Sequence, residues 1–537
     1  MRSDVVRTYR DIHSWVGVCC GLALFIAFYA GALTMFELPL QRWASPPTAL
    51  PAPPPLTASA ALVNATIAEQ PAAARAYYVN VVTGPETPAR VTWPAGPPRS
   101  RDDPGPVIEF GASLAEDGSW TSTRIEAAPV AAFIDRLHQQ LGLPLPHGAA
   151  SFVTGAVALA YGLALIAGFI ALLPNLLPDL FALRLGSSLK RLWLDVHNAL
   201  GVVSLPFHLV MALTVVVFAF HDVFYAAQDA VVYEGRLHQQ WAQGRPTRAE
   251  RAPTAALLEP DLLVNRIVEQ APEFVPTRLE YATDADGRVS TRVLGHDFRH
   301  ALRGPTFGLA TVDPYDGRLL QTDYLPGRQP PYPAIVTNLF ALHFGNYGGI
   351  AVRWAYFVLG LAGAVLFYTG NLLWIEGRRR LAKRVAPAPT QARSARLLGS
   401  LTVGVALGCM AGISASLAAT KWLPGRVGDV AAWHEGIYHS VFLGSVAWAF
   451  LRGPARGAVE LLSLAALATL LVPLTSLVAA LAPGLGPWNW GGSTLAIDGV
   501  AVVGALLFAW AARRTRRRTL GAPHDSIWAT PTAAGHG

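Results

Sequence analysis

Long apolar runs alternate with long polar segments along this 537-residue chain. A membrane-crossing helix needs about 20 predominantly apolar residues to span a hydrocarbon core of about 30 Å. Eight runs meet this requirement, so the pattern predicts a membrane all-α helical bundle of about eight transmembrane helices. The predicted spans lie near residues 14–36, 151–173, 197–220, 352–375, 399–418, 435–452, 459–482 and 494–512.

Two polar segments, residues 37–150 and 221–350, are long enough to form small domains. Alternating positions in the second segment predict a helix and then four strands, at 261–271, 277–283, 289–295, 307–313 and 318–324. The first segment repeats this order more loosely after a proline-rich linker, with a helix at 59–70 and strands at 76–83 and 89–94. The pattern predicts two small α+β domains within an internal duplication of helix, domain and helix.

Composition agrees with a membrane protein, since 52% of the residues are hydrophobic and only 14% are charged. Lysine and arginine cluster before the first predicted span, between the second and third, after the fourth and after the eighth. Because basic loops remain in the cytoplasm, both termini are predicted to be cytoplasmic and both polar segments periplasmic, in a bacterial inner membrane. The net charge of +7 is then a topology signal and does not indicate nucleic-acid binding. Lys421 and Arg426, in a short outside loop, are exceptions to the pattern.

A short phrase occurs twice, each time directly before an apolar run: residues 11–18 contain His13 and residues 195–202 contain His197. A second repeated phrase, Leu-His, contains His138 and His343. The predicted topology places His13 and His197 at inner ends of spans, and His138 and His343 near outer ends. A histidine at a membrane entrance is usually an interfacial polar residue, but matching positions in a duplicated bundle can also build two metal centres.

Two neutral imidazoles that face each other across a helical bundle are the usual axial ligands of a b-type haem. Pairing His13 with His197, and His138 with His343, would place one haem near each membrane face. An electron would then cross the core of about 30 Å in shorter steps. The three cysteines of the chain all lie in predicted spans, so the outer segments contain no thiolate metal site and no disulfide.

Further candidate residues accompany these histidines. Gly17 and Gly201 stand at the same place in the two repeated phrases, where a small residue makes room for a porphyrin, although such glycine spacing is also typical of helix packing. His208 lies eleven residues after His197, close to three helical turns, so it is predicted to project from the same face near mid-membrane. It could bind the outer haem, hydrogen-bond a propionate or relay a proton. Other histidines near the outer surface, among them His434, are interpreted as interfacial or solvated.

Three longer motifs carry a resemblance to a known family. They are the run from Asp195 to Met211, the run from Leu342 to Gly349 with Arg353, and the run from Thr369 to Trp374 before a basic cluster. Over roughly residues 1–385 the chain resembles the PepSY-associated transmembrane family. The resemblance implies PepSY-like periplasmic domains and, from members that are ferrisiderophore reductases with two b-type haems, the ligands His13, His138, His197 and His343. Residues 173–175 and 212–215 depart from the family pattern at positions that affect packing more than ligation.

The predicted spans and polar segments, together with the extent of the family resemblance, divide the chain into parts. Spans five to eight lie beyond the resemblance and are interpreted as an extra C-terminal module for scaffolding or partner docking. The parts are residues 1–36 (first span), 37–150 (first PepSY-like domain), 151–220 (spans two and three), 221–350 (second PepSY-like domain), 351–385 (span four and a basic loop), 386–520 (C-terminal four-span module) and 521–537 (cytoplasmic tail).

The chain has neither a glycine-rich dinucleotide motif nor a Walker loop, so its electrons have to come from another molecule. A cytoplasmic flavoprotein or membrane quinol is the expected donor, and a periplasmic ferric siderophore or another oxidant is the expected acceptor. Ferrous iron is bound more weakly than ferric iron by hard oxygen ligands, which suits release of iron for uptake. The function predicted is thus a haem-dependent ferrisiderophore reductase. The alternatives are a membrane-anchored PepSY regulatory or sensor protein without redox activity and, third, a permease.

Overall fold

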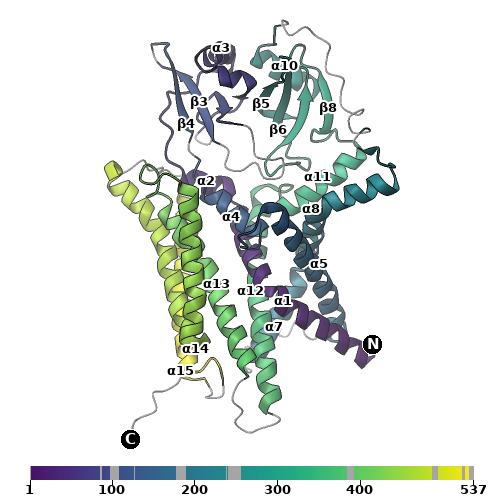
Figure 1. Ribbon diagram of the computed structural model, residues 1–537, viewed down its shortest axis with the longest axis vertical. Coiled ribbons are helices and arrows are strands. Elements are labelled where there is room, and N and C mark those ends of the chain that lie inside the picture. Colours follow the sequence, from purple (N-terminus) through teal and green to yellow (C-terminus); the bar gives the residue numbers. More distant parts are fainter. Residues whose placement is uncertain are drawn as a thin grey trace. The chain divides into compact units, whose positions relative to one another are not determined.

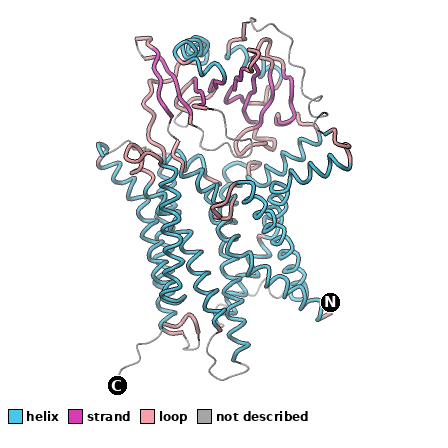
Figure 2. The backbone as a smooth tube through the Cα atoms, in the orientation of Figure 1, coloured by secondary structure: helices cyan, strands magenta, loops and turns pink. Residues whose placement is uncertain are grey.

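The computed structural model of the chain separates into two compact units, whose elements are labelled in Figure 1. The first unit comprises residues 1–46, 128–219 and 355–537, and the second comprises residues 47–127 and 220–354. Figure 2 distinguishes the helices from the strands, and every strand of the described residues belongs to the second unit. The structure describes residues 2–84, 87–96, 108–115, 117–125, 127–176, 189–237, 239, 256–383, 392–485, 494–522 and 526–530. Residues 523–525 and 531–537 of the predicted tail lie outside these ranges.

Seven helices of the described residues are long and apolar enough to cross a membrane. Helix α13 is the most enclosed of them, because 78% of its most apolar window is buried, against 17% for the corresponding window of α15. The chain is therefore a multi-pass membrane protein in which α13 is surrounded by other helices. The seven are α1 (Ser3–Thr34), α5 (His147–Leu172), α8 (Leu205–Val231), α12 (Gly349–Lys383), α13 (Arg393–Ala419), α14 (Val430–Leu481) and α15 (Leu495–Leu520).

The difference between eight predicted spans and seven helices arises in α14, which has 52 residues. Its backbone leaves the helical region at Gly453 (φ 73°, ψ 164°), and Pro454 follows. The chain turns back there, because Trp448 on one side of Gly453 donates a 2.6 Å hydrogen bond to Glu460 on the other. The predicted sixth and seventh spans correspond to the two arms of this one bent helix.

The predicted third span is also divided. Helix α7 (Leu189–Val203) ends one residue before Ser204, and α8 begins at Leu205. Pro206 lacks the backbone N–H that a continuous helix would use, and its ring clashes with the carbonyl four residues earlier, which explains the break. Ser204 donates its hydroxyl to the carbonyl of Leu200, which also accepts the backbone N–H of Ser204 at 2.9 Å.

Two short helices, α2 (Glu37–Ala44) and α4 (Val130–Gln139), belong to the helical unit, although the sequence placed their residues in the first polar domain. The reason is the apolar face of α4, where Phe133 and Ile134 are buried in one cluster with Trp43 of α2 and Tyr438 of α14. Arg136 of α4 also forms a 2.8 Å ion pair with Glu435 of α14. These contacts fix α4 against the C-terminal helices.

The second unit contains one eight-stranded antiparallel sheet in the order β4-β3-β2-β1-β5-β6-β7-β8. The helix and four strands predicted in the second polar segment are confirmed, whereas β3 and β4 of the first segment were not predicted. The elements are α3 (Ser59–Glu69), β1 (Ala76–Asn80), β2 (Val91–Pro94), β3 (Glu109–Leu114), β4 (Trp120–Ile125), α10 (Pro260–Gln270), β5 (Val275–Thr283), β6 (Val289–His296), β7 (Gly308–Val312), β8 (Leu319–Tyr324) and α11 (Pro331–Phe344).

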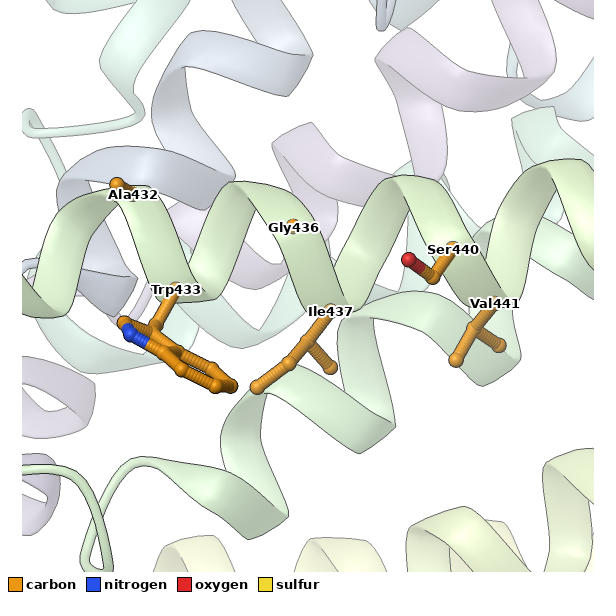
Figure 3. A pocket seen from close by; sticks show the side chains of 6 residues that line it. All are labelled: Ala432, Trp433, Gly436, Ile437, Ser440 and Val441. Carbon is orange, nitrogen blue, oxygen red and sulfur yellow. The ribbon is translucent and has the colours of Figure 1, made fainter. Parts of the chain in front are cut away.

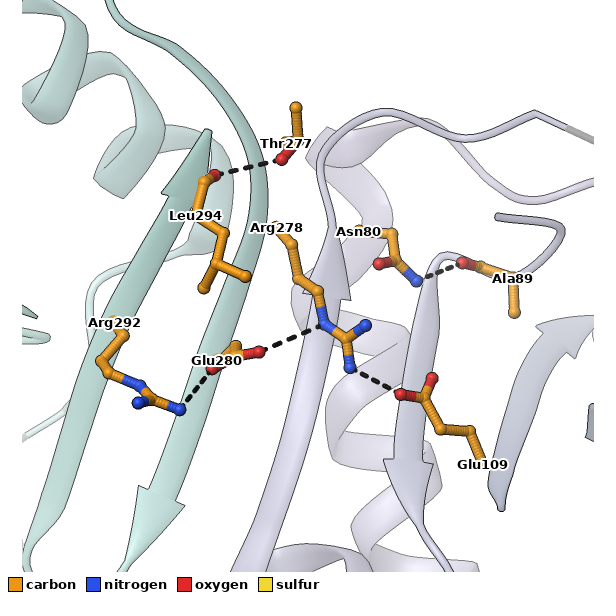
Figure 4. A network of polar contacts seen from close by, with 8 residues as sticks. All are labelled: Asn80, Ala89, Glu109, Thr277, Arg278, Glu280, Arg292 and Leu294. Carbon is orange, nitrogen blue, oxygen red and sulfur yellow. Dashed lines mark hydrogen bonds and ion pairs between the residues drawn. The ribbon is translucent and has the colours of Figure 1, made fainter. Parts of the chain in front are cut away.

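The two polar segments share this sheet, which differs from the two separate domains that the sequence predicted. Strand β1 of the first segment pairs with β5 of the second, with Ala76 opposite Ala282 and Asn80 opposite Arg278. Because β1 and β5 pair with each other, neither is an exposed edge strand, whereas in two separate domains each of them would be one. On the polar side of the seam, Arg278 forms a 2.8 Å ion pair with Glu109 and lies 3.7 Å from Glu280 (Figure 4).

Candidate functional site

His13 of α1 is held against α5. Its Nδ1 atom lies 2.8 Å from the backbone carbonyl oxygen of Ala164. Because a carbonyl can only accept, Nδ1 carries the hydrogen and Nε2 keeps its lone pair. The ring fits there because Gly168, one turn after Ala164, has no side chain: a Cβ atom at Gly168 would lie 2.6 Å from Nδ1 of His13.

His138 of α4 is held by the same arrangement on α1. Its Nδ1 atom lies 2.8 Å from the carbonyl oxygen of Ala27, and a Cβ atom at Gly31 would lie 2.6 Å from that nitrogen. Ala27 and Gly31 are again one turn apart, so a glycine leaves a helix carbonyl accessible to a second donor. Burial lowers the pKa of His138, an effect that the bond to Ala27 opposes, so the ring is neutral at pH 7.

His197 of α7 is held by a side chain of α12. Its Nδ1 atom lies 3.2 Å from Oγ1 of Thr369, whose own hydroxyl donates to the carbonyl of Leu366 at 3.0 Å. Since the hydroxyl hydrogen is used in that bond, Oγ1 accepts from His197 and Nδ1 carries the ring hydrogen. His13, His138 and His197 therefore share one tautomer, with a basic Nε2, which is the form that binds a metal.

The structure brings His13 and His197 together. Their ring centres lie 6.2 Å apart with an angle of 75° between the ring planes. They come from the two copies of the repeated phrase, on α1 and α7, and each ring is anchored to a further helix. Four helices thus fix the positions of the two imidazole rings.

His208 of α8 is fully buried among aromatic residues. Its Nδ1 atom lies 2.6 Å from the hydroxyl of Tyr161 on α5, and its Nε2 atom has no hydrogen-bond partner among the described residues. The ring of Phe28 is 5.4 Å away and that of Phe367 is 6.5 Å away. An unpaired polar atom in such surroundings is costly, which makes His208 a candidate for ligand binding.

The remaining predicted residues lie elsewhere. His343 is in α11 of the second unit, whereas His138 is in α4 of the first, so their pairing stays a prediction. A Cβ atom at Gly17 would have nothing within 4 Å, and one at Gly201 would have only Leu366, at 3.8 Å. Gly17 borders open space, and neither of these two glycines contacts a histidine ring, in contrast to Gly31 and Gly168.

The sequence reasoning missed Ala27, Ala164, Gly168 and Tyr161, which hold the histidines, and it named Thr369 only as part of a family motif. Tyr161 and Thr369 carry a signal, because each is a hydroxyl within an apolar run. Ala164 carries none, since it acts through its backbone carbonyl.

The interpretation of His434 as interfacial or solvated is corrected in one respect, because the side chain is not solvated. Its side chain is fully buried, with Nε2 3.4 Å from Oγ1 of Thr420 and no partner for Nδ1 among the described residues. Close packing of α13 against α14 explains this burial. Gly412 of α13 lies so near Tyr438 of α14 that a Cβ atom at Gly412 would be 2.9 Å from the tyrosine ring.

Two carboxyl groups lie on the short helices α2 and α4. Burial, and then the charge of Asp135, raises the pKa of Glu37 to about 7. Burial raises the pKa of Asp135 to about 6, while a hydrogen bond from Gln139 opposes the shift. Asp135 stands one turn before His138, so the charge close to this histidine changes near neutral pH.

A shallow groove on α14 offers no comparable chemistry. Figure 3 shows side chains that line it, all from one stretch of this helix. The lining residues are Ala432, Trp433, Gly436, Ile437, Ser440 and Val441. One hydroxyl among apolar groups suits contact with lipid or another helix more than binding of a polar ligand.

The fold and these histidines define a multi-pass membrane protein whose helical unit holds oriented imidazoles, which are half-buried at His13, His138 and His197 and fully buried at His208. The family model for the PepSY-associated TM region matches residues 10–376, which is more than half of the chain. The chain belongs to this family. No curated protein matches the sequence. The matched range ends within α12, so α13, α14 and α15 lie beyond it.

Proposed function

We propose that this protein is a haem-dependent oxidoreductase of the bacterial inner membrane, which passes electrons from the cytoplasmic side to a periplasmic acceptor. The observation that carries the proposal is the pair His13 and His197. Their rings lie 6.2 Å apart, and Nδ1 of each is anchored to another helix. Both rings therefore present Nε2 as a ligand from a fixed position.

The distance suits a single metal ion between the two rings. Metal–nitrogen bonds of about 2 Å, and roughly 1 Å from nitrogen to ring centre, separate two opposed imidazole centres by about 6 Å. Within the part of the chain that the structure describes, no group of three or more His, Cys, Asp or Glu side chains could hold a bare ion. A six-coordinate b-type haem needs only two ligands from the protein, so His13 and His197 fit such a haem. The open position beside Gly17 supports the same conclusion.

A second haem is proposed for His138 and His343, with His208 as a further candidate ligand. His138 has the same tautomer as the first pair, which supports its assignment. His208 contributes a buried Nε2 atom that has no partner in the part of the chain that the structure describes, and Tyr161 fixes its ring from the other side. Bound haem supplies reversible one-electron transfer, and two such groups would divide the distance across the membrane.

Basic residues support the proposed orientation, with both termini in the cytoplasm. The end of α12 carries Arg378 and Arg379, the end of α15 carries Arg517 and Arg518, and the N-terminal end of α1 carries Arg7. Positive charge near helix ends marks the cytoplasmic side. The donor is then a cytoplasmic flavoprotein or quinol, and the proposed acceptor is a ferric siderophore, whose reduction releases iron from hard oxygen ligands.

The test is the visible spectrum of the purified protein, oxidised and reduced, together with a pyridine haemochrome assay. We expect two b-type haems per chain, and we expect His13→Ala and His197→Ala each to remove the same one. His300→Ala, at a half-exposed position outside the helical unit, is the control and should keep both. A colourless protein from haem-replete cells would reject the proposal and favour the PepSY regulatory protein.

The acceptor needs a separate measurement. Dithionite-reduced protein is mixed with a ferric siderophore or with a quinone, and reoxidation is followed optically. Rapid reoxidation by the ferric siderophore supports the reductase assignment. Reoxidation by the quinone alone would leave a haem protein with a different acceptor.

A further inference from the structure

A buried polar cluster joins the C-terminal helices to α2. It consists of Lys421, just after α13, with Ser476 of α14, Asp498 of α15 and Trp43 of α2. Lys421 is only 4% exposed and Asp498 only 8%. Ionisable side chains are rare inside membrane proteins, and replacement of a buried charged pair by apolar residues is often neutral for stability, so such a pair is a candidate functional site.

Ser476 stands between the two charged groups. Its Oγ accepts from Nζ of Lys421 at 2.8 Å and donates to Oδ1 of Asp498 at 2.9 Å. Trp43 Nε1 donates to the same two oxygens, at 3.1 Å to Ser476 and 3.0 Å to Asp498. The ammonium group of Lys421 also lies 4.3 Å from the centre of the Trp43 ring. All hydrogen-bonding positions of the Ser476 hydroxyl are thus occupied.

The other carboxylate oxygen of Asp498, Oδ2, is buried and makes no hydrogen bond to the described residues. A metal cation is a poor occupant, because Lys421 is positive and the described residues hold no group of three or more metal-binding side chains here. An anion is excluded by the carboxylate itself. Protonation of Oδ2 would neutralise the carboxylate and so reduce the cost of burying this oxygen.

We propose that Asp498 is a proton-binding site of the C-terminal helices, and that Ser476 passes a proton between Lys421 and Asp498. A proton that arrives at Oδ2 breaks none of the existing hydrogen bonds. In the internal transfer, Lys421 gives one proton to Oγ of Ser476 as the serine gives its own to Asp498, so both charged groups become neutral. No oxidant or further reactant takes part.

The surroundings leave Lys421 and Asp498 as each other's main charged neighbour. Burial lowers the pKa of Lys421 to about 8, and Asp498 opposes that shift. From α14 the titratable side chain of His434 contacts Thr420 beside Lys421, and α2 contributes the uncharged Trp43. Among the described residues, Lys421 and Asp498 are thus the two charged members of this cluster. It does not depend on the proposed haem function.

Infrared difference spectra of the full-length protein between about pH 6 and about pH 9 test the proposal. We expect the carbonyl band of a protonated carboxylic acid that disappears at high pH and is absent from Asp498→Asn. Ser414→Ala is the matched control, because Ser414 is a buried α13 hydroxyl bonded to Thr469 at 2.9 Å, and it should leave the band unchanged. A difference spectrum without such a band, or the same band in Asp498→Asn, overturns the proposal.

Lys421→Met provides a second measurement in case Asp498→Asn does not fold. Removal of the positive charge should move the midpoint of the band to higher pH by about one unit or more. Ser476→Ala should slow the exchange of this proton with solvent deuterium, since the bridging hydroxyl is lost. An unchanged midpoint in Lys421→Met would show that the two groups are not coupled, which contradicts the proposed transfer.

Discussion

His13 and His138 are each held by a helix carbonyl that a glycine leaves uncovered. The carbonyls of Ala27 and Ala164 each accept an imidazole hydrogen at 2.8 Å, and a glycine one turn later provides the space. A carbonyl has two lone pairs, so it can serve both its own helix and the histidine. At the scale of single residues, the orientation of these rings depends on the absence of one methyl group.

Gly168→Ala tests this dependence. The new Cβ atom would lie 2.6 Å from Nδ1 of His13, so the ring has to move and the pair with His197 is disturbed. We expect the haem content to fall to about half, together with a loss of about 1–3 kcal/mol in stability. Gly17→Ala is the control, since a Cβ atom there meets nothing within 4 Å. Full haem content in Gly168→Ala would contradict the proposed role of His13.

Lys421 predicts a pH dependence of stability. Its pKa is about 8 in the folded protein against 10.5 as the ordinary value, so the unfolded chain binds more protons between these pH values. Stability is therefore expected to rise as the pH increases from 8 towards 10.5. Lys421→Met should flatten this rise in thermal unfolding, whereas Arg426→Met, at an exposed site in the same connection, should keep it. An equal slope in both variants would refute the prediction.

At the scale of elements, α14 shows how one residue divides a helix into two arms. Helix α13 lies beside both arms, because Gly412 contacts Tyr438 and Ser414 is hydrogen-bonded to Thr469. The two arms approach each other closely, since a Cβ atom at Gly457 would lie 3.2 Å from Cα of Ala449. A change of direction at Gly453 is what allows 52 residues to pack in this way.

Gly453→Ala should destabilise the protein. The conformation at Gly453, φ 73° and ψ 164°, is one that only glycine adopts readily, and its cost for alanine is about 1–3 kcal/mol. Gly444→Ala lies in the same helix, has open space at its Cβ position and removes a flexible helical glycine, so it should be neutral or slightly stabilising. Thermal unfolding in detergent compares them. Equal stability of both variants would contradict a glycine-dependent turn.

At the scale of the whole molecule, the sheet joins two segments that are separated by the second and third spans. Tyr77 of β1 stacks on Tyr281 of β5 with ring centres 4.6 Å apart, and the core below includes the buried Val79 and Leu279. Helices α3 and α10 contribute Leu62 and Leu263 to the same core. The second unit therefore has one hydrophobic core and is expected to unfold as one.

Leu279→Ala tests this cooperativity. Leu279 is fully buried, so the substitution should cost about 2–5 kcal/mol. We expect amide hydrogen exchange to accelerate in both segments, including β2 and β3, and not only in β5 and β6. Ser290→Ala, at an exposed site on β6, is the control and should leave exchange unchanged. Faster exchange confined to residues 256–325 would indicate two independent domains.

The sequence by itself determined what depends on neighbours along the chain. Apolar runs predicted the membrane helices, and alternation predicted α10 and β5 to β8, because both patterns repeat within a few residues. His13 and His197 were likewise predicted as a pair, because each lies in a short phrase of adjacent residues that occurs twice. Local patterns were weaker for β3 and β4, whose residues follow a polar insertion.

Only the tertiary structure decided the contacts between distant residues. The partner of His13 is 151 residues away and acts through its backbone, so no side-chain pattern reveals it. Ser476 and Asp498 are likewise brought to Trp43 from more than 400 positions along the chain. The pairing of β1 with β5 requires that the residues of both strands align in one register, and the sequence of either strand alone does not specify that register. Ring tautomers, the bend of α14 and the shared sheet are therefore properties of the folded molecule.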